Sequence, residues 1–272
     1  MKSTQSILAA MLLMLTATFL LSGQAAAASL FLEDLTWTEL HADIVGGKTT
    51  LIIPVGGVEQ SGPHIALGKH NVRVKILAGK IAAELGNAIV APVVTYVPEG
   101  SLGKPTGHMR FSGTISVPDD AFQSILVGAA RSLKQHGFVN LVLIGDHGGY
   151  QAQLAQVAAA LNREWVGTPA RVWFIEDYYR AAATDYAQLL RARGFSAAHI
   201  GTHAGLADTA LMLATDPTLV RSGLIDHALA DGPATGVAGD PQGATVALGQ
   251  LGVDLIVTRT VAAIRTAVAG RR

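Results

Sequence analysis

Short apolar runs alternate along the chain with longer stretches in which apolar residues recur every three or four positions. The short runs are rich in β-branched residues and predict strands at 50–55, 88–94, 139–144 and 171–175. The longer stretches predict helices at 72–85, 119–136, 151–165, 206–214 and 252–268. Strands that alternate with helices are typical of βαβ construction, so we expect an α/β protein built on a mainly parallel sheet.

The N-terminal segment has the pattern of an export signal. Lys2 is followed by an apolar run at 7–21 and by the small residues 25–28. A membrane anchor is the alternative, but the run of about 15 residues is short for a span of about 20. We therefore expect residues 1–28 to be a signal peptide that is removed, leaving a periplasmic or secreted protein without a membrane anchor. Residues 29–272 contain no internal repeat or low-complexity linker and predict a single domain.

The amino-acid composition limits which partners and which reactive groups are possible. Hydrophobic residues make up 50% of the chain, which is enough for a sizeable core. Twenty basic residues balance twenty acidic ones, so the sequence has no overall charge signal for a nucleic-acid partner. There is no cysteine. Disulfides and thiolate chemistry are therefore excluded, and reactive groups must come from His, Asp, Glu, Ser or Tyr.

Titratable residues follow the ends of three predicted strands. Glu59 follows the first strand, Asp146 and His147 follow the third, and Glu176 and Asp177 follow the fourth. Ligands of parallel sheets bind beyond the carboxyl ends of the strands. The sequence therefore predicts a metal-binding or catalytic site at this edge, although Glu176 and Asp177 could instead begin a helix.

Five segments resemble, in the same order, the sequence motifs of the creatininase family. They lie at 54–70, 111–116, 145–150, 202–209 and 236–241. The resemblance implies a three-layer sandwich with helices on both faces of the sheet, and assembly into homo-oligomers. It also implies metal-dependent hydrolysis of non-peptide C–N bonds, often in cyclic or formylated amides, at a site with two metal ions.

The sequence departs from the family pattern at its metal ligands. Glu59 and His147 are retained, but Ser61 stands in place of a histidine and His70 in place of an aspartate that bridges two metals. An imidazole offers one free nitrogen and is a poor bridge. Glu59, His70 and His147 remain as a set that suits one divalent metal per chain, zinc or manganese, rather than two.

Other candidate residues come from the same motifs. By analogy with the family, His203 would protonate the leaving nitrogen, and Asp208 is a second candidate for moving the proton. His64, Gly148 and Gly149 are candidates for substrate binding. The alternatives are a turn-stabilising histidine at 64 and a tight turn at 148–149. His108 lies in the glycine-rich loop 103–113, which could cover the site, or it could be an ordinary surface histidine.

Two functions fit these observations. The first is a metal-dependent amidohydrolase that acts on a small cyclic or formylated amide through a metal-bound hydroxide. The alternative is a catalytically inactive relative that binds a small ligand in the same pocket. Metal analysis of the purified protein discriminates between them.

Overall fold

A parallel four-stranded sheet forms the centre of the protein. In this computed structural model, which describes residues 29–230 and 232–270, the strand order is β2-β1-β3-β4. The strands span Thr50–Val55 (β1), Ala88–Val90 (β2), Asn140–Gly145 (β3) and Arg171–Phe174 (β4). The predicted α/β class and the four predicted strands are confirmed, although β2 is shorter than the predicted run. The predicted signal peptide lies outside the described residues.

Helices flank the sheet on both sides. The longer ones are α2 (Trp37–Val45), α3 (Lys69–Leu85), α4 (Asp119–Gln135), α5 (Gln151–Glu164), α9 (Leu206–Thr215) and α11 (Val246–Ala269). Shorter helical segments are α6 (Asp177–Arg180), η4 (Ala181–Asp185), α7 (Tyr186–Arg191), α8 (Ala197–Ile200) and α10 (His227–Ala230). The five predicted helices are confirmed, with boundaries shifted by up to six residues. The pattern did not predict α2 or the helical segment 177–191.

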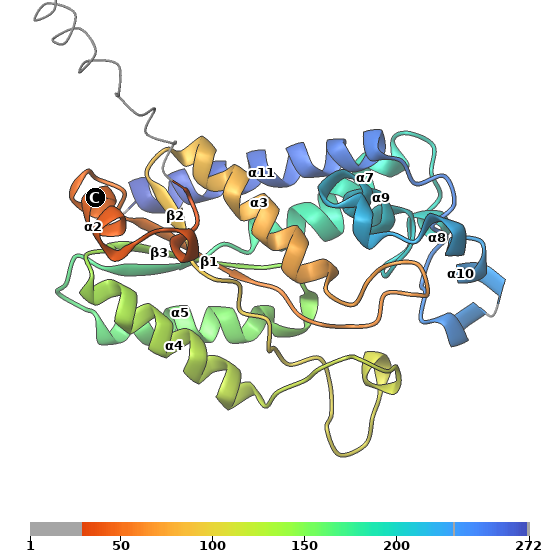
Figure 1. Cartoon of the computed structure of the whole chain (residues 1–272), viewed down its shortest axis with the longest axis horizontal. Coiled ribbons are helices and arrows are strands. Elements are labelled where there is room, and N and C mark those ends of the chain that lie inside the picture. The colour runs from red at the N-terminus through yellow and green to blue at the C-terminus, as the bar shows by residue number, and fades with distance from the viewer. Residues whose placement is uncertain (1–28, 231, 271–272) are drawn as a thin grey trace, which may run out of the picture.

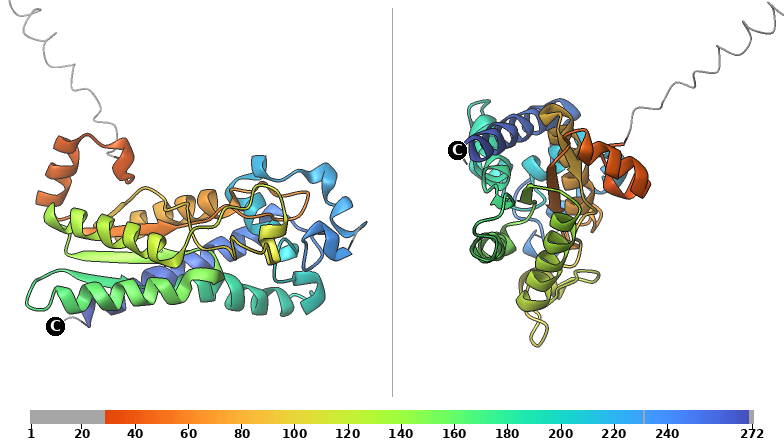
Figure 2. Two further views of the ribbon diagram at one scale, coloured as in Figure 1. Left: turned by 90° about the horizontal axis from the view of Figure 1, so that it is seen from below. Right: turned by 90° about the vertical axis from the view of Figure 1, so that its left-hand side faces the viewer.

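Alternating side chains of β1 and β3 point to opposite faces of the sheet. Leu51 and Leu141 pack with α4 and α5, whereas Ile52 and Val142 pack with α3 and α11. Figure 1 shows these two helical layers above and below the sheet. In the right-hand view of Figure 2, α2 (red) and α11 (blue) lie on different sides of the molecule. This arrangement is the expected three-layer sandwich.

The last helix, α11, is long and apolar enough by length and composition to cross a membrane. In the structure it packs against α9 and α3, and Val253, Ile256 and Val261 are buried in the core. The face of α11 that carries these residues therefore belongs to the core of the described fold.

The two central strands end at the same edge of the sheet. Pairing of β1 with β3 runs in register from Thr50 opposite Asn140 to Val55 opposite Gly145. Chain segments that leave these strands therefore begin side by side, as expected for parallel strands. This register brings the loop containing Glu59 next to Asp146 and His147.

Candidate functional site

A cavity of about 500 Å³ lies at this edge of the sheet. Its lining includes the loops after β1 and β3, the first turn of α3, the first turn of α9 and the loops 201–203 and 236–238. Among the residues predicted from the sequence, it contains Glu59, His70, His147, Gly148, His203 and Asp208. The structure therefore brings together side chains that are up to 149 residues apart in sequence.

The backbone turn that follows β1 packs closely against α3 and positions Glu59. The amide of Gly57 donates a hydrogen bond of 2.9 Å to Asn71 Oδ1 on α3. A Cβ atom at position 56 would lie 2.2 Å from the same Oδ1 atom, so only glycine fits between the strand end and α3. The loop then turns into the interior, where the Glu59 side chain is completely buried.

The Glu59 carboxylate lies among four imidazoles and an ammonium group. Its Oε1 atom is 2.7 Å from His70 Nε2, 3.4 Å from Lys69 Nζ and 3.6 Å from His203 Nδ1. Its Oε2 atom is 3.4 Å from His147 Nε2 and 3.5 Å from His108 Nε2. Within the described part of the chain, Oε2 has no hydrogen-bond partner.

The atoms around Glu59 Oε2 fit a metal ion. Ligand atoms of Glu59, His108 and His147 all lie within 4.8 Å of one another. Two ligands on a tetrahedral zinc ion, with bonds of about 2.0–2.1 Å, lie about 3.4 Å apart. The distances of 3.4 and 3.5 Å from Oε2 to the two imidazole nitrogens match that spacing.

Each ring nitrogen of His70 contacts a carboxylate. Its Nδ1 atom is 2.6 Å from Asp146 Oδ2 and its Nε2 atom is 2.7 Å from Glu59 Oε1. Burial alone would lower the pKa of His70, but these two bonds outweigh it and raise the pKa. With both nitrogens donating, the ring has no lone pair for a metal ion. The structure thus places His108, rather than His70, in the metal-ligand group with Glu59 and His147.

Cations and carboxylates balance one another behind Glu59. Arg73 bonds Asp146 through Nε at 2.9 Å and Asp208 through Nη1 at 2.9 Å, and Lys69 Nζ lies 3.2 Å from Asp208 Oδ2. Burial alone would raise the pKa of Asp208, but Lys69 and Arg73 hold it well below the ordinary value. Asp208 therefore has the contacts of a permanent counter-ion for Lys69 and Arg73.

Burial also raises the pKa of Glu59, but the charges of Lys69 and His70 and the bond to His70 lower it far more, so that this carboxylate stays ionised. The same holds for Asp146, whose pKa is lowered because Arg73 and His70 outweigh its burial. Glu59 therefore keeps a full negative charge, as a metal ligand requires.

His203 presents one free nitrogen to the cavity. Its Nε2 atom donates to the backbone oxygen of Gln60 at 2.8 Å, which leaves the lone pair on Nδ1 facing Glu59. Burial, together with the charge of Lys69, lowers the pKa of His203 to about 4. The ring is therefore neutral at pH 7 and can accept a proton at Nδ1.

The remaining predicted residues lie outside this arrangement or at its border. His64 is fully buried, bonds Thr209 at 3.0 Å and does not line the cavity, so the geometry gives no support to a substrate-binding role. The Gly149 amide donates to His147 Nδ1 at 3.2 Å. Gly148 lines the cavity at the start of a 3-10 helical turn, Gly148–Tyr150, and a Cβ atom on it would lie 2.5 Å from Tyr179 Oη.

Glu176 and Asp177 do not join the site. Glu176 is exposed at the N-cap of α6, and Asp177 pairs with Arg180. They belong to the start of a helix, which was the alternative to a role at the rim.

Lys69, Arg73 and Glu99 are site residues that the sequence analysis did not select. The predicted helix began at residue 72, whereas α3 begins at Lys69. With this earlier start, residues 69, 70 and 73 share one helical face, because side chains three and four positions apart are neighbours. A charged face inside an apolar helix was the signal that could have revealed Lys69 and Arg73.

The metal-free protein is expected to lose stability as the pH falls from about 6.5 towards about 4. Burial lowers the pKa of His64, His147 and His203 to about 4, 3 and 4, so these rings stay neutral in the fold but gain protons on unfolding. Glu99 opposes this trend, because burial raises its pKa to about 8 and it releases its proton on unfolding. Net uptake is therefore about two protons, and stability falls as protons are added.

Urea unfolding between pH 7 and 5 measures this dependence. A His64→Gln variant is the control, since it should reduce the proton uptake by about one. A free energy of unfolding that does not fall between pH 7 and 5 would contradict the assignment of three neutral imidazoles in the folded protein.

Comparison with known proteins identifies relatives. The family model described as "Creatininase: Creatinine amidohydrolase" matches residues 33–264. Creatinine amidohydrolase of Pseudomonas putida is 29% identical over 208 residues, covering 73% of this chain and 77% of that protein. The mycofactocin precursor peptide peptidase of Mycolicibacterium smegmatis is 32% identical over 119 residues, covering 42% of this chain and 45% of that protein. The 3-dehydro-scyllo-inosose hydrolase of Thermotoga maritima is 31% identical over 99 residues, or 36% of this chain and 30% of that protein.

Solved structures give the same result. A crystal structure of creatininase has a TM-score of 0.73 and 26% identity, covering 89% of this chain and 98% of its own. A creatininase variant described as the Zn-Zn type has the same TM-score and identity and covers 89% of this chain and 99% of its own. A structure described as creatininase Mn has a TM-score of 0.71 and 26% identity, with coverage of 88% and 99%. With a family model that matches most of its length, this chain belongs to the creatininase family of hydrolytic enzymes.

Proposed function

We propose that this enzyme hydrolyses the C–N bond of a small cyclic or formylated amide with the help of one divalent metal ion, zinc or manganese. The observation that carries the proposal is that ligand atoms of Glu59, His108 and His147 lie within 4.8 Å of one another, with both Nε2 atoms facing Glu59 Oε2. An ion held there supplies a Lewis acid that polarises a carbonyl group and lowers the pKa of a bound water towards about 7.

His203 is suited to move the proton that hydrolysis requires. Its neutral ring offers Nδ1 to the cavity, and its bond to the Gln60 backbone oxygen holds that orientation. Nδ1 can accept the proton of the attacking water and donate it to the leaving nitrogen, which departs poorly without a proton. Asp208 remains a predicted participant, and its contacts favour holding Lys69 and Arg73 over carrying a proton.

The contacts of the carboxylates favour one ion over two. Each oxygen of Asp146 and Asp208 already has a charged or hydroxyl partner: Arg73, His70, Lys69 or Tyr178. Glu59 Oε1 is likewise taken by His70 and Lys69. Three cations, counting protonated His70, thus balance three carboxylates in the interior. A second ion that binds to one of these three carboxylates would have to displace one of these cations.

Metal analysis and a substrate screen test the proposal together. We expect about one zinc or manganese ion per chain after mild purification, and hydrolysis of at least one creatinine-like lactam, formamide or hydantoin. A short peptide belongs in the screen because a partial relative is a peptidase. Two tightly bound ions per chain would contradict the stoichiometry. Cleavage of the peptide alone would replace the proposed substrate class.

We propose two further properties on sequence grounds. The pattern of Lys2, the apolar run 7–21 and the alanines at 25–28 favours export, with a mature chain that begins near Ser29. The intact mass of protein from its native host tests this. The family resemblance favours a homo-oligomer, which light scattering of the purified protein tests.

A further inference from the structure

Glu99 is a buried carboxylate next to the site. It is 8% exposed, and both of its oxygens lack a hydrogen-bond partner among residues 29–230 and 232–270. Its position is nevertheless well defined, because its amide donates to Ser116 Oγ at 3.0 Å. A Cβ atom on Gly57 would lie 2.5 Å from Glu99 Oε1, so the glycine makes room for the carboxylate. A buried carboxylate without partners is costly and calls for an explanation in function.

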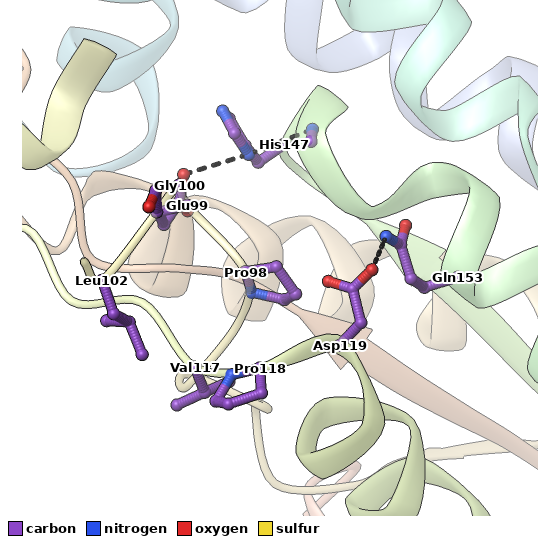
Figure 3. Close-up of a pocket in the computed structure, with 11 residues that line it drawn as sticks. Pro98, Glu99, Gly100, Leu102, Val117, Pro118, Asp119, His147 and Gln153 are labelled. Carbon is purple, nitrogen blue, oxygen red and sulfur yellow. Dashed lines mark hydrogen bonds and ion pairs between the residues drawn. The ribbon is translucent and has the colours of Figure 1, made fainter. Parts of the chain in front are cut away.

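The two nitrogens of His147 face two different carboxylates. Nε2 is 3.4 Å from Glu59 Oε2, and Nδ1 is 3.3 Å from Glu99 Oε2. Figure 3 shows Glu99 and His147 pointing towards one another beside a second cavity of about 550 Å³. Nδ1 also accepts the N–H of Gly149 at 3.2 Å. A neutral ring has one N–H, so Nδ1 can accept from Gly149 or donate to Glu99, but not both at once.

We propose that Glu99 is a positioning residue that accepts the Nδ1–H of His147 and thereby turns the Nε2 lone pair towards the metal site. The inference rests on the proposed metal-dependent function. A histidine that binds a metal through one nitrogen commonly donates its other N–H to a carboxylate, which fixes the tautomer and the ring orientation. Glu99 supplies that acceptor from loop 95–118, after β2, while Glu59 supplies the ligand from the loop after β1.

His108 provides a contrast within the same site. Its Nδ1 atom lies 2.8 Å from Gln60 Nε2. The Gln60 amide is oriented by Gly62, whose N–H donates to Oε1, and by Gly236, whose carbonyl oxygen accepts from Nε2. Gln60 therefore donates to His108 Nδ1 and favours a proton on the Nε2 atom that faces Glu59. His108 must give up this bond and move the proton to Nδ1 before its Nε2 atom can bind an ion. His147, with an acceptor beside Nδ1, is better prepared to bind the ion.

A comparison of variants at position 99 tests this assignment. Zinc affinity should fall about 10- to 100-fold in Glu99→Met, which keeps the length of the side chain but removes the acceptor. Glu99→Gln retains an acceptor oxygen and should lie between Met and the wild type. Asp119→Asn is the matched control, because Asp119 lines the same cavity but bonds Gln153 instead of His147, and its affinity should be unchanged.

Two readouts separate positioning from a merely structural role. Without metal, and at a pH above the value of about 8 to which burial raises the pKa of Glu99, Glu99→Met should be more heat-stable than the wild type, because it removes a buried, ionised carboxylate. In the same metal-free samples, ¹⁵N NMR of His147 should show a shift towards the Nε2–H tautomer. Unchanged zinc affinity and an unchanged tautomer in Glu99→Met would overturn the assignment. A wild type that binds no metal would refute the proposed function instead, while the tautomer comparison would still decide the role of Glu99.

Discussion

Replacement of Glu59 by glutamine is expected to abolish tight metal binding and, with it, turnover. The carboxylate contributes the one unpartnered oxygen that faces both His108 and His147 within the described part of the chain. A neutral amide is a weak ligand for a divalent ion that is otherwise held by neutral imidazoles. Elemental analysis and calorimetric titration with zinc measure the loss.

The same substitution should also reduce stability. His70 and Lys69 each lose a carboxylate partner in a buried cluster, and breaking a buried pair typically costs about 3–5 kcal/mol. Both cations keep a second carboxylate, Asp146 for His70 and Asp208 for Lys69, so the lower end of that range is expected. Glu176→Gln is the control, because this exposed side chain follows β4 but lies outside the cavity. Normal metal content in Glu59→Gln would place the metal elsewhere.

Replacement of His203 by alanine is expected to lower turnover by about 10²- to 10⁴-fold while leaving the metal content intact, as is typical for loss of a general acid or base. His203 Nδ1 lies 3.6 Å from Glu59 Oε1, whereas the proposed ligands His108 and His147 face Glu59 Oε2. Its removal therefore takes away the proton carrier but none of the three proposed ligands. Steady-state kinetics on the amide found in the screen, with parallel metal analysis, measures both effects.

His199→Ala is the matched control for this prediction. His199 lies four residues earlier, in α8, where its ring bonds the backbone oxygen of Gln242 at 2.7 Å outside the cavity. It should keep normal turnover. Loss of metal from His203→Ala would show that His203 is itself a ligand, and unchanged turnover would show that another group carries the proton.

Much of the fold could be predicted from the local pattern of apolar and polar residues. Buried parallel strands such as β3 are continuous apolar runs, and amphipathic helices such as α4 repeat with the period of the helix, so both can be identified without tertiary information. Short helices such as those at 177–191 have too few turns for a clear period. The motifs also identified Glu59, His147 and His203, because these residues follow strands or occur in segments that resemble a known family.

Which partner each side chain meets was decided only by the tertiary structure. By its position in the motif, His70 resembled a ligand, yet in the fold it lies between Glu59 and Asp146 and has no lone pair to offer. His108 and Glu99 come from a loop with no strand or helical pattern, and the packing of that loop brings them to Glu59 and His147. A sequence determines the residue types and their order, whereas coordination and protonation depend on distances of 3–4 Å between segments far apart in the chain. Those distances exist only once the sheet register, the start of α3 and the loop packing are set.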